Sequence, residues 1–243
     1  MSCHAEFLRV AQSNDDRLAR AVLHEPVDGL VDHAGDARQR ALIELVLAVT
    51  REPWTLSPDD RERWHALGDD DLVHAIALSS YFGHLNRIAD AVAVPLDYTV
   101  AIAAPRVDRS IAALAAAPEG SRAKRGELVL EHRPATATAI AAWRAYLDAK
   151  PGPLARDARV QIARWVAGWL GDAVDDTRDA APDPDLRRLA ELVTLAPWQL
   201  DDETFGPLRA RGFDDSTLFD ACITASSAGA FSRITVALAG LSA

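Results

Sequence analysis

One segment of this chain occurs twice, and this repeat constrains the fold more than any other feature of the sequence. Residues 45 to 94 align with residues 189 to 240, with a gap of two residues near the middle. The matched positions are Thr50, Pro53, Trp54, Leu56 and Gly68 with Thr194, Pro197, Trp198, Leu200 and Gly212, followed by Leu72, Ala75, Ser80, Gly83, Arg87 and Ile88 with Leu218, Ala221, Ser226, Gly229, Arg233 and Ile234. Residues this informative do not realign in order by chance, so we interpret the match as an internal duplication.

The hydrophobic period is helical throughout the chain. Gly and Pro lie mostly at joints, and long alternating runs of β-branched residues are missing. Ser57, Pro58 and Asp60 predict a capped short helix that ends at Gly68. The other expected helices span residues 6–23, 36–51, 70–94, 106–116, 135–150, 155–170, 171–179, 185–195, 201–211 and 214–241. The sequence therefore predicts an all-α fold of two tandem helical modules related by a pseudo-twofold axis.

A polar stretch separates the two copies. Residues 119 to 134 read EGSRAKRGELVLEHRP, a mixture of charges that is typical of a linker. The predicted organisation is a first module at 1–117, a linker at 118–134 and a second module at 135–243, with the two cores fused.

Charge and composition limit the partners and the compartment. A formal net charge of -10 argues against nucleic acid and against anionic membranes, because both require Lys and Arg to neutralise phosphates. We find no apolar run near the roughly 20 residues of a membrane span, and the start MSCHAEFLR lacks a signal-peptide core. The expected location is the cytoplasm. Cys3 and Cys222 are the only cysteines, so neither a disulfide framework nor a thiolate metal site is expected, and no cofactor is predicted.

The repeated unit resembles a known family. Its pattern is VTREPWTL at residues 49 to 56, then Gly68, an acidic turn at 69 to 71, and YFGHLNRIAD at 81 to 90. This pattern is similar to the peroxidase-related branch of the alkylhydroperoxidase (AhpD) and carboxymuconolactone decarboxylase superfamily. The second copy keeps the Thr, Pro-Trp, Gly and Arg but has Ser232 in place of Asn. The resemblance implies a helical module that packs into dimers, trimers or hexamers. Because the duplicated chain already contains one pair of modules, a compact monomer or a small closed homo-oligomer is expected.

The residues that carry the family's peroxidase chemistry are replaced in this chain. The resemblance implies a Glu on an upstream helix and then C-x2-C-x3-H, with a resolving and an attacking cysteine. In the second module Val160 stands at the Glu, Asp172 and Asp175 at the cysteines, and Asp179 at the His. In the first module His4 matches the motif His, so the sequence begins just after the positions of the two cysteines. A dithiol peroxidase is therefore not expected, because the cycle needs a reactive thiolate and a partner thiol.

The remaining candidates for catalysis are His84, Tyr81, Glu44 and Arg87. Tyr81, His84 and Arg87 follow one another at helical spacing, and histidine is suited to proton transfer near neutral pH. The expected function is thiol-independent acid-base chemistry on a small organic molecule. The alternatives are a non-catalytic binding or scaffolding relative and residual alkylhydroperoxidase activity. An apolar cleft that holds His84 beside a carboxylate favours the enzyme, whereas a filled cleft favours the scaffold; Arg87 is equally interpretable as a buried structural cation.

Two further patterns carry expectations. Asp172, Asp175, Asp176 and Asp179 share one helical face and suit either Mg²⁺ or a solvated capping turn; the simpler turn is preferred, and no metal site is predicted. The long helices are expected to form the interface between the modules. The apolar residues assigned to that interface are Ile76, Leu85, Val92, Ile223, Phe231 and Leu238.

Overall fold

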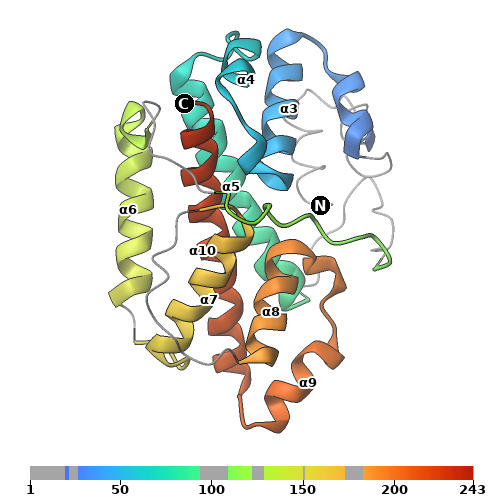
Figure 1. Ribbon diagram of the computed structural model, residues 1–243, viewed down its shortest axis with the longest axis vertical. Helices are drawn as coiled ribbons and strands as arrows, with labels where there is room; N and C mark the ends of the chain where they lie inside the picture. Colours follow the sequence, from blue (N-terminus) through green and yellow to red (C-terminus); the bar gives the residue numbers. More distant parts are fainter. Residues whose placement is uncertain are drawn as a thin grey trace.

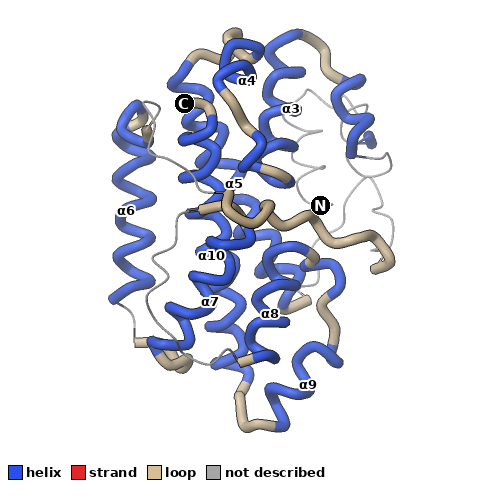
Figure 2. The backbone as a smooth tube through the Cα atoms, in the orientation of Figure 1, coloured by secondary structure: helices blue, strands red, loops and turns tan. Residues whose placement is uncertain are grey.

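The computed structural model describes residues 20–21, 27–93, 109–121, 129–149, 151–172 and 183–242. All regular structure in these ranges is helical and no strand occurs among them (Figure 2), which confirms the predicted all-α class. The expected helix at 6–23 lies outside the described residues except for its last part, where Arg20 and Ala21 are helical. The expected helix at 171–179 also lies outside them beyond Asp172.

The described elements include 3-10 helices (η) and α-helices. In chain order they are η1 (Val27–His33), α3 (Ala37–Arg51), η2 (Pro53–Thr55), α4 (Pro58–Arg63), α5 (Asp69–Ala91), η3 (Leu130–His132), α6 (Pro134–Ala149), α7 (Arg156–Trp169), α8 (Pro184–Leu195), η4 (Pro197–Gln199), α9 (Asp202–Ala210) and α10 (Asp215–Gly240). Within the described residues, the predicted helices fall within a few residues of these bounds, with two exceptions. The short helix expected to end at Gly68 ends at Arg63, and the helix expected at 106–116 does not form at 109–116.

The helix expected at 106–116 is wrong over its described part, because residues 109 to 121 contain only turns and irregular backbone. The amides of this segment bind the ends of other helices instead. Leu114 N donates to Leu195 O at 2.8 Å, and Ala117 N donates to Trp169 O at 2.7 Å. The last carbonyls of a helix have no intrahelical partners. The amides of this segment bind such carbonyls of α8 and α7, so they are not available for hydrogen bonds within a helix of their own.

The order of elements is the same in the two copies of the repeat. The first is α3, η2, α4 and α5, and the second is α8, η4, α9 and α10. The long helix of each copy follows a glycine with positive φ, 70° at Gly68 and 91° at Gly212, a conformation that glycine adopts without strain. In the first copy the capping box at Ser57 and Asp60 is present, but α4 already ends at Arg63. The order of elements is therefore as predicted, and the pseudo-twofold axis stays a prediction.

The two long helices pack along each other in the middle of the molecule (Figure 1). By length and composition α10 is apolar enough to cross a membrane, so the expectation that no such segment exists is wrong. However, 78% of its apolar window is buried inside the fold, as in the core helix of a folded domain.

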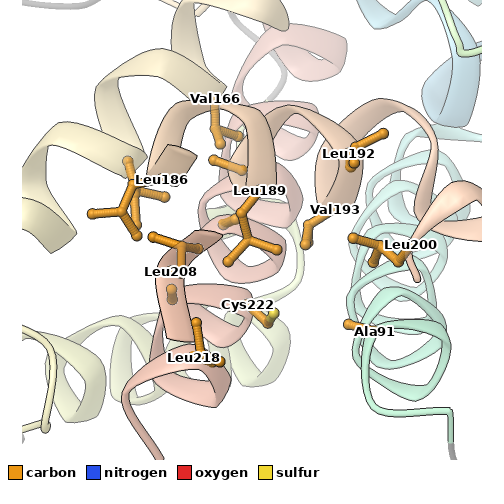
Figure 3. Close-up of a cluster of buried hydrophobic side chains, with 14 of the residues drawn as sticks. Ala91, Val166, Leu186, Leu189, Leu192, Val193, Leu200, Leu208, Leu218 and Cys222 are labelled. Carbon is orange, nitrogen blue, oxygen red and sulfur yellow. The ribbon is translucent and has the colours of Figure 1, made fainter. Parts of the chain in front are cut away.

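The buried clusters cross the boundary between the predicted modules. The cluster around α3 and α5 also contains Ile234, Ala237, Leu238 and Leu241 of α10. The second cluster, formed mainly by α7, α8 and α10, includes Ala91 of α5 (Figure 3). Each copy therefore completes the core of the other, as expected for fused cores.

The residues expected at the interface divide into three groups, of which Ile223 and Phe231 form the half-buried one. Ile76 and Leu238 are buried, with exposed fractions of 0% and 6%. Leu85 and Val92 are 39% and 43% exposed, so they lie outside the α5–α10 interface. The prediction for these two residues is wrong because they face away from α10 on the helix surface.

Residues 1 to 117 expressed alone are expected to be aggregated or molten. This fragment lacks the α10 side chains that close the first cluster, and their loss leaves apolar surface in water. Light scattering and the amide chemical-shift dispersion of the fragment would measure this, with the full chain as the folded control. A soluble fragment with well-dispersed amide signals would show that the first module folds independently.

Candidate functional site

Two buried arginines occupy equivalent positions on the central helices. Arg87 on α5 and Arg233 on α10 are 6% and 3% exposed. Arg87 Nε donates to Thr194 O of α8 at 3.2 Å, and Arg233 Nε donates to Thr50 O of α3 at 3.2 Å. Each arginine therefore binds the first helix of the other copy, and the contact is reciprocal.

These contacts cap helix C-termini. Thr50 and Thr194 lie in the last turns of α3 and α8, where backbone carbonyls have no intrahelical amide. A guanidinium satisfies such a carbonyl and places positive charge at the negative end of the helix dipole. Arg233 Nη2 also reaches Thr194 O at 3.4 Å. Burial lowers the pKa of Arg87 to about 10, so its guanidinium still carries its charge at neutral pH.

A glycine four residues before each arginine makes these contacts possible. Nη1 of Arg87 donates to Gly83 O at 3.0 Å, and Nη1 of Arg233 donates to Gly229 O at 3.2 Å. A Cβ at Gly83 would lie 2.9 Å from Arg87 Nη1, and one at Gly229 would lie 3.0 Å from Arg233 Nη1. The repeated Gly-x3-Arg pattern is thus a requirement of the guanidinium lying flat against its own helix.

His84, one of the predicted catalytic residues, lies in the same crossing. It is 7% exposed, and its Nδ1 lies 2.9 Å from Ser226 Oγ and 3.4 Å from Ser227 Oγ of α10. Because Ser226 Oγ donates its single proton to Ile223 O at 3.1 Å, the arrangement fits a His84 tautomer whose Nδ1–H donates to Ser226. Burial, assisted by the charge of Arg87, lowers the pKa of His84 to about 4. The imidazole is therefore neutral at pH 7.

An aromatic side chain from α6 covers His84. The Trp143 ring centre lies 4.7 Å from that of His84, 5.7 Å from Tyr81 and 4.5 Å from Phe231. Within the described residues, the contacts of His84 include no carboxylate. The site at His84 is thus filled by Trp143 and two serines.

The other predicted catalytic residues are arranged unevenly. Tyr81 is 41% exposed, and its ring centre lies 6.3 Å from that of His84. Glu44 instead accepts a hydrogen bond from Trp64 Nε1 at 2.9 Å, and its carboxylate lies 3.8 Å from Arg63. The structure therefore brings His84, Tyr81 and Arg87 together, whereas the contacts of Glu44 lie elsewhere. Their catalytic roles stay predictions.

The two copies differ at the His84 contact. Ser80, the counterpart of Ser226, is 2% exposed, and its Oγ has no hydrogen-bond partner in the part of the chain that the structure describes. The residue at the position equivalent to His84 is Ala230, which cannot supply one. The unpaired hydroxyl of Ser80 is therefore the mark of a contact that only one copy keeps. The alignment of the two copies could have pointed to Ser226, because it matches Ser80. Trp143 lies outside the repeat, so no sequence pattern pointed to it.

The positions of the family's thiol chemistry hold no reactive thiol in the described part of the chain. Cys222 is 1% exposed within the cluster of Figure 3, and burial raises the pKa of its thiol to about 12. Val160 is 37% exposed on α7. Asp172 follows α7, and its amide donates to Ala167 O at 2.9 Å. Cys3 and the remaining positions of the acidic face, Asp175, Asp176 and Asp179, lie outside the described residues.

Gly83→Ala is expected to destabilise the protein by on the order of 1–2 kcal/mol, because the new Cβ displaces the guanidinium of Arg87 and leaves buried carbonyls unpaired. Alanine in place of a helical glycine ordinarily stabilises by roughly 0.5–1 kcal/mol. Gly168→Ala on α7 is the matched control, since no atom lies within 4 Å of its added Cβ. Urea unfolding would measure the free energy of unfolding of both variants. Equal stabilisation by the two substitutions would contradict the claim that Gly83 makes room for the Arg87 guanidinium.

His84 predicts a loss of stability in acid. Its folded pKa of about 4 lies below the unfolded value of 6.5, so the unfolded chain binds the extra proton between these values. The contribution is present above pH 6.5 and falls by about 3 kcal/mol as the pH drops to 4. Unfolding free energies of the wild type and of His84→Gln at pH 7, 5.5 and 4 should diverge by this amount. His65→Gln, which removes an exposed histidine, is the control and should keep the wild-type dependence of the unfolding free energy on pH. The wild-type dependence in His84→Gln would show that His84 is not its cause.

Comparisons with known proteins do not assign this chain to a family. No protein-family model matches the chain, and no match emerges from the curated proteins or from the solved structures. The resemblance to the alkylhydroperoxidase (AhpD) family therefore remains a hypothesis. The function is therefore inferred from the contacts of His84, the arginine caps and the protonation of the Cys222 thiol.

Proposed function

We propose that this protein is a non-catalytic relative of the alkylhydroperoxidase (AhpD) and carboxymuconolactone decarboxylase type, and that its paired helical modules serve binding or scaffolding. The observation that carries the proposal is the filled site at His84. Its Nδ1 bonds to Ser226, and the Trp143 ring lies 4.7 Å away. A filled cleft is the feature that separates the scaffold from the enzyme.

The state of His84 argues against general base catalysis. A general base must come within about 2.6–3.2 Å of the atom that carries the proton, and its pKa should lie near the working pH. His84 is 7% exposed, and its pKa is lowered to about 4. A substrate would have to displace Trp143 and recruit a weak base. The acid-base enzyme expected from the sequence would thus require the Trp143 ring to move away from His84.

The thiol chemistry of the family is disfavoured for a separate reason. The attacking species in that chemistry is a thiolate, and a thiol with a pKa of about 12 is protonated at neutral pH. Asp172 and Asp175 stand at the positions that correspond to the two family cysteines. Residual alkylhydroperoxidase activity is therefore the weakest of the three candidate functions.

The same proposal includes the setting in which the protein works. We place it in the cytoplasm, without nucleic-acid or membrane partners, as a small closed oligomer or a compact monomer. Its ligand is a small molecule. The formal charge of -10 and the burial of α10 within the fold support these choices.

The purified protein is expected not to reduce an organic hydroperoxide with a dithiol reductant, and the double variant Cys3→Ser with Cys222→Ser should behave identically. Turnover would be followed by loss of cumene hydroperoxide. Thiol-dependent turnover that the double variant loses would overturn the proposal. So would conversion of any compound in a metabolite library that the wild type performs and a folded His84→Gln variant does not.

A further inference from the structure

A cavity of about 440 Å³ opens where the start of α7 meets α8, the end of α9 and the start of α10. It lies outside the contacts of His84, and neither Val160 nor Asp172, which stand at family catalytic positions, lines it. Its volume falls in the range of roughly 300–1,000 Å³ that small-molecule sites occupy. The apolar part of its wall consists of Pro153, Leu154, Ala155, Ala158, Leu186 and Phe213.

The basic side chain at this cavity is already neutralised. Arg211 Nη1 donates to Asp183 Oδ1 at 2.9 Å and to Asp185 Oδ2 at 3.0 Å, and its Nη2 donates to Asp183 Oδ2 at 2.6 Å. Asp183 in turn caps α8, accepting from the amides of Asp185 and Leu186. Two carboxylates thus hold one guanidinium, which leaves little attraction for an anionic ligand.

Two polar side chains at the cavity, those of Asp157 and Thr217, offer hydrogen-bond acceptors, and Gln161 also lines it with an amide that both donates and accepts. Asp157, an exposed residue in the first turn of α7, has neither a hydrogen bond nor an ion pair among the described residues. Thr217 Oγ1 donates its proton to Asp214 Oδ1 at 2.6 Å, so only its lone pairs face a ligand. A ligand that suits this lining brings its own donors and a positive charge, together with an apolar body for the wall.

We propose that this cavity binds an organic amine, with its apolar body against Leu186 and Phe213 and its ammonium group at the Asp157 carboxylate. The inference rests on the proposed binding function and names the class of its ligand. An ammonium beside the Asp157 carboxylate adds the attraction of opposite charges to its hydrogen bond, whereas an alcohol brings only the hydrogen bond and a carboxylate is repelled. The site should therefore prefer a positively charged ligand over a neutral or negatively charged ligand of the same shape.

The test compares three probes of similar shape on the full chain: 2-phenylethylamine, 2-phenylethanol and 3-phenylpropanoate. Amide chemical-shift titrations at pH 7 and low salt would measure each dissociation constant and locate the shifts. The amine should bind about tenfold more tightly than the alcohol, the carboxylate should bind least, and added salt should reduce the difference. The shifts should concentrate at residues 153 to 161 and 211 to 217.

Two matched variants separate this site from general charge attraction. Asp157→Asn should remove most of the preference for the amine, whereas Asp59→Asn, which neutralises an exposed first-turn carboxylate of α4, should leave it unchanged. Equal affinities for the three probes, no saturation below about 10 mM amine, or an unchanged preference in Asp157→Asn would each overturn the inference. None of these results bears on peroxide reduction or on His84, so failure here is distinguishable from failure of the proposed function.

Discussion

The fold depends on the capping of each copy's first helix by an arginine from the other copy. Arg87 and Arg233 are buried, and their acceptors are the backbone carbonyls of Thr194 and Thr50. A buried cation is costly unless it is satisfied, and here the negative ends of two helices provide the compensation. Since both Nε contacts run from one copy to the other, they tie the folding of each half to the presence of the other.

The caps also account for the glycine that precedes each arginine by four residues. A Cβ at Gly83 or Gly229 would lie 2.9 or 3.0 Å from the nearest guanidinium nitrogen, so a larger side chain there would displace the guanidinium. The remaining space beside Arg87 holds His84, which stays neutral because it is buried next to that cation. In the other copy the same position is Ala230, and the Ser80 hydroxyl has no hydrogen-bond partner among the described residues. The two copies thus share their order of elements and differ in these polar contacts.

The two regions considered for function differ in access. His84 is enclosed by α10 and by Trp143 of α6, so its imidazole supports the packing of three helices. The cavity at α7 is open, has an apolar wall and carries the unpaired carboxylate of Asp157. Binding sites need both access and unsatisfied polar groups, and this cavity combines them. The proposed binding function and its amine ligand follow from that contrast.

The sequence by itself determined the helical class, the repeated order of elements and the special positions within it. Periodicity located the long helices, and the capping box at Ser57 and the glycines before α5 and α10 act locally, so sequence reasoning reaches them. It failed for residues 109 to 116, whose amides cap α7 and α8, because the competing partner lies far away in the chain. Only the tertiary structure decided that Glu44 pairs with Trp64, that Trp143 covers His84 and that Asp157 faces a cavity. These outcomes depend on contacts between distant segments, which helical spacing does not encode.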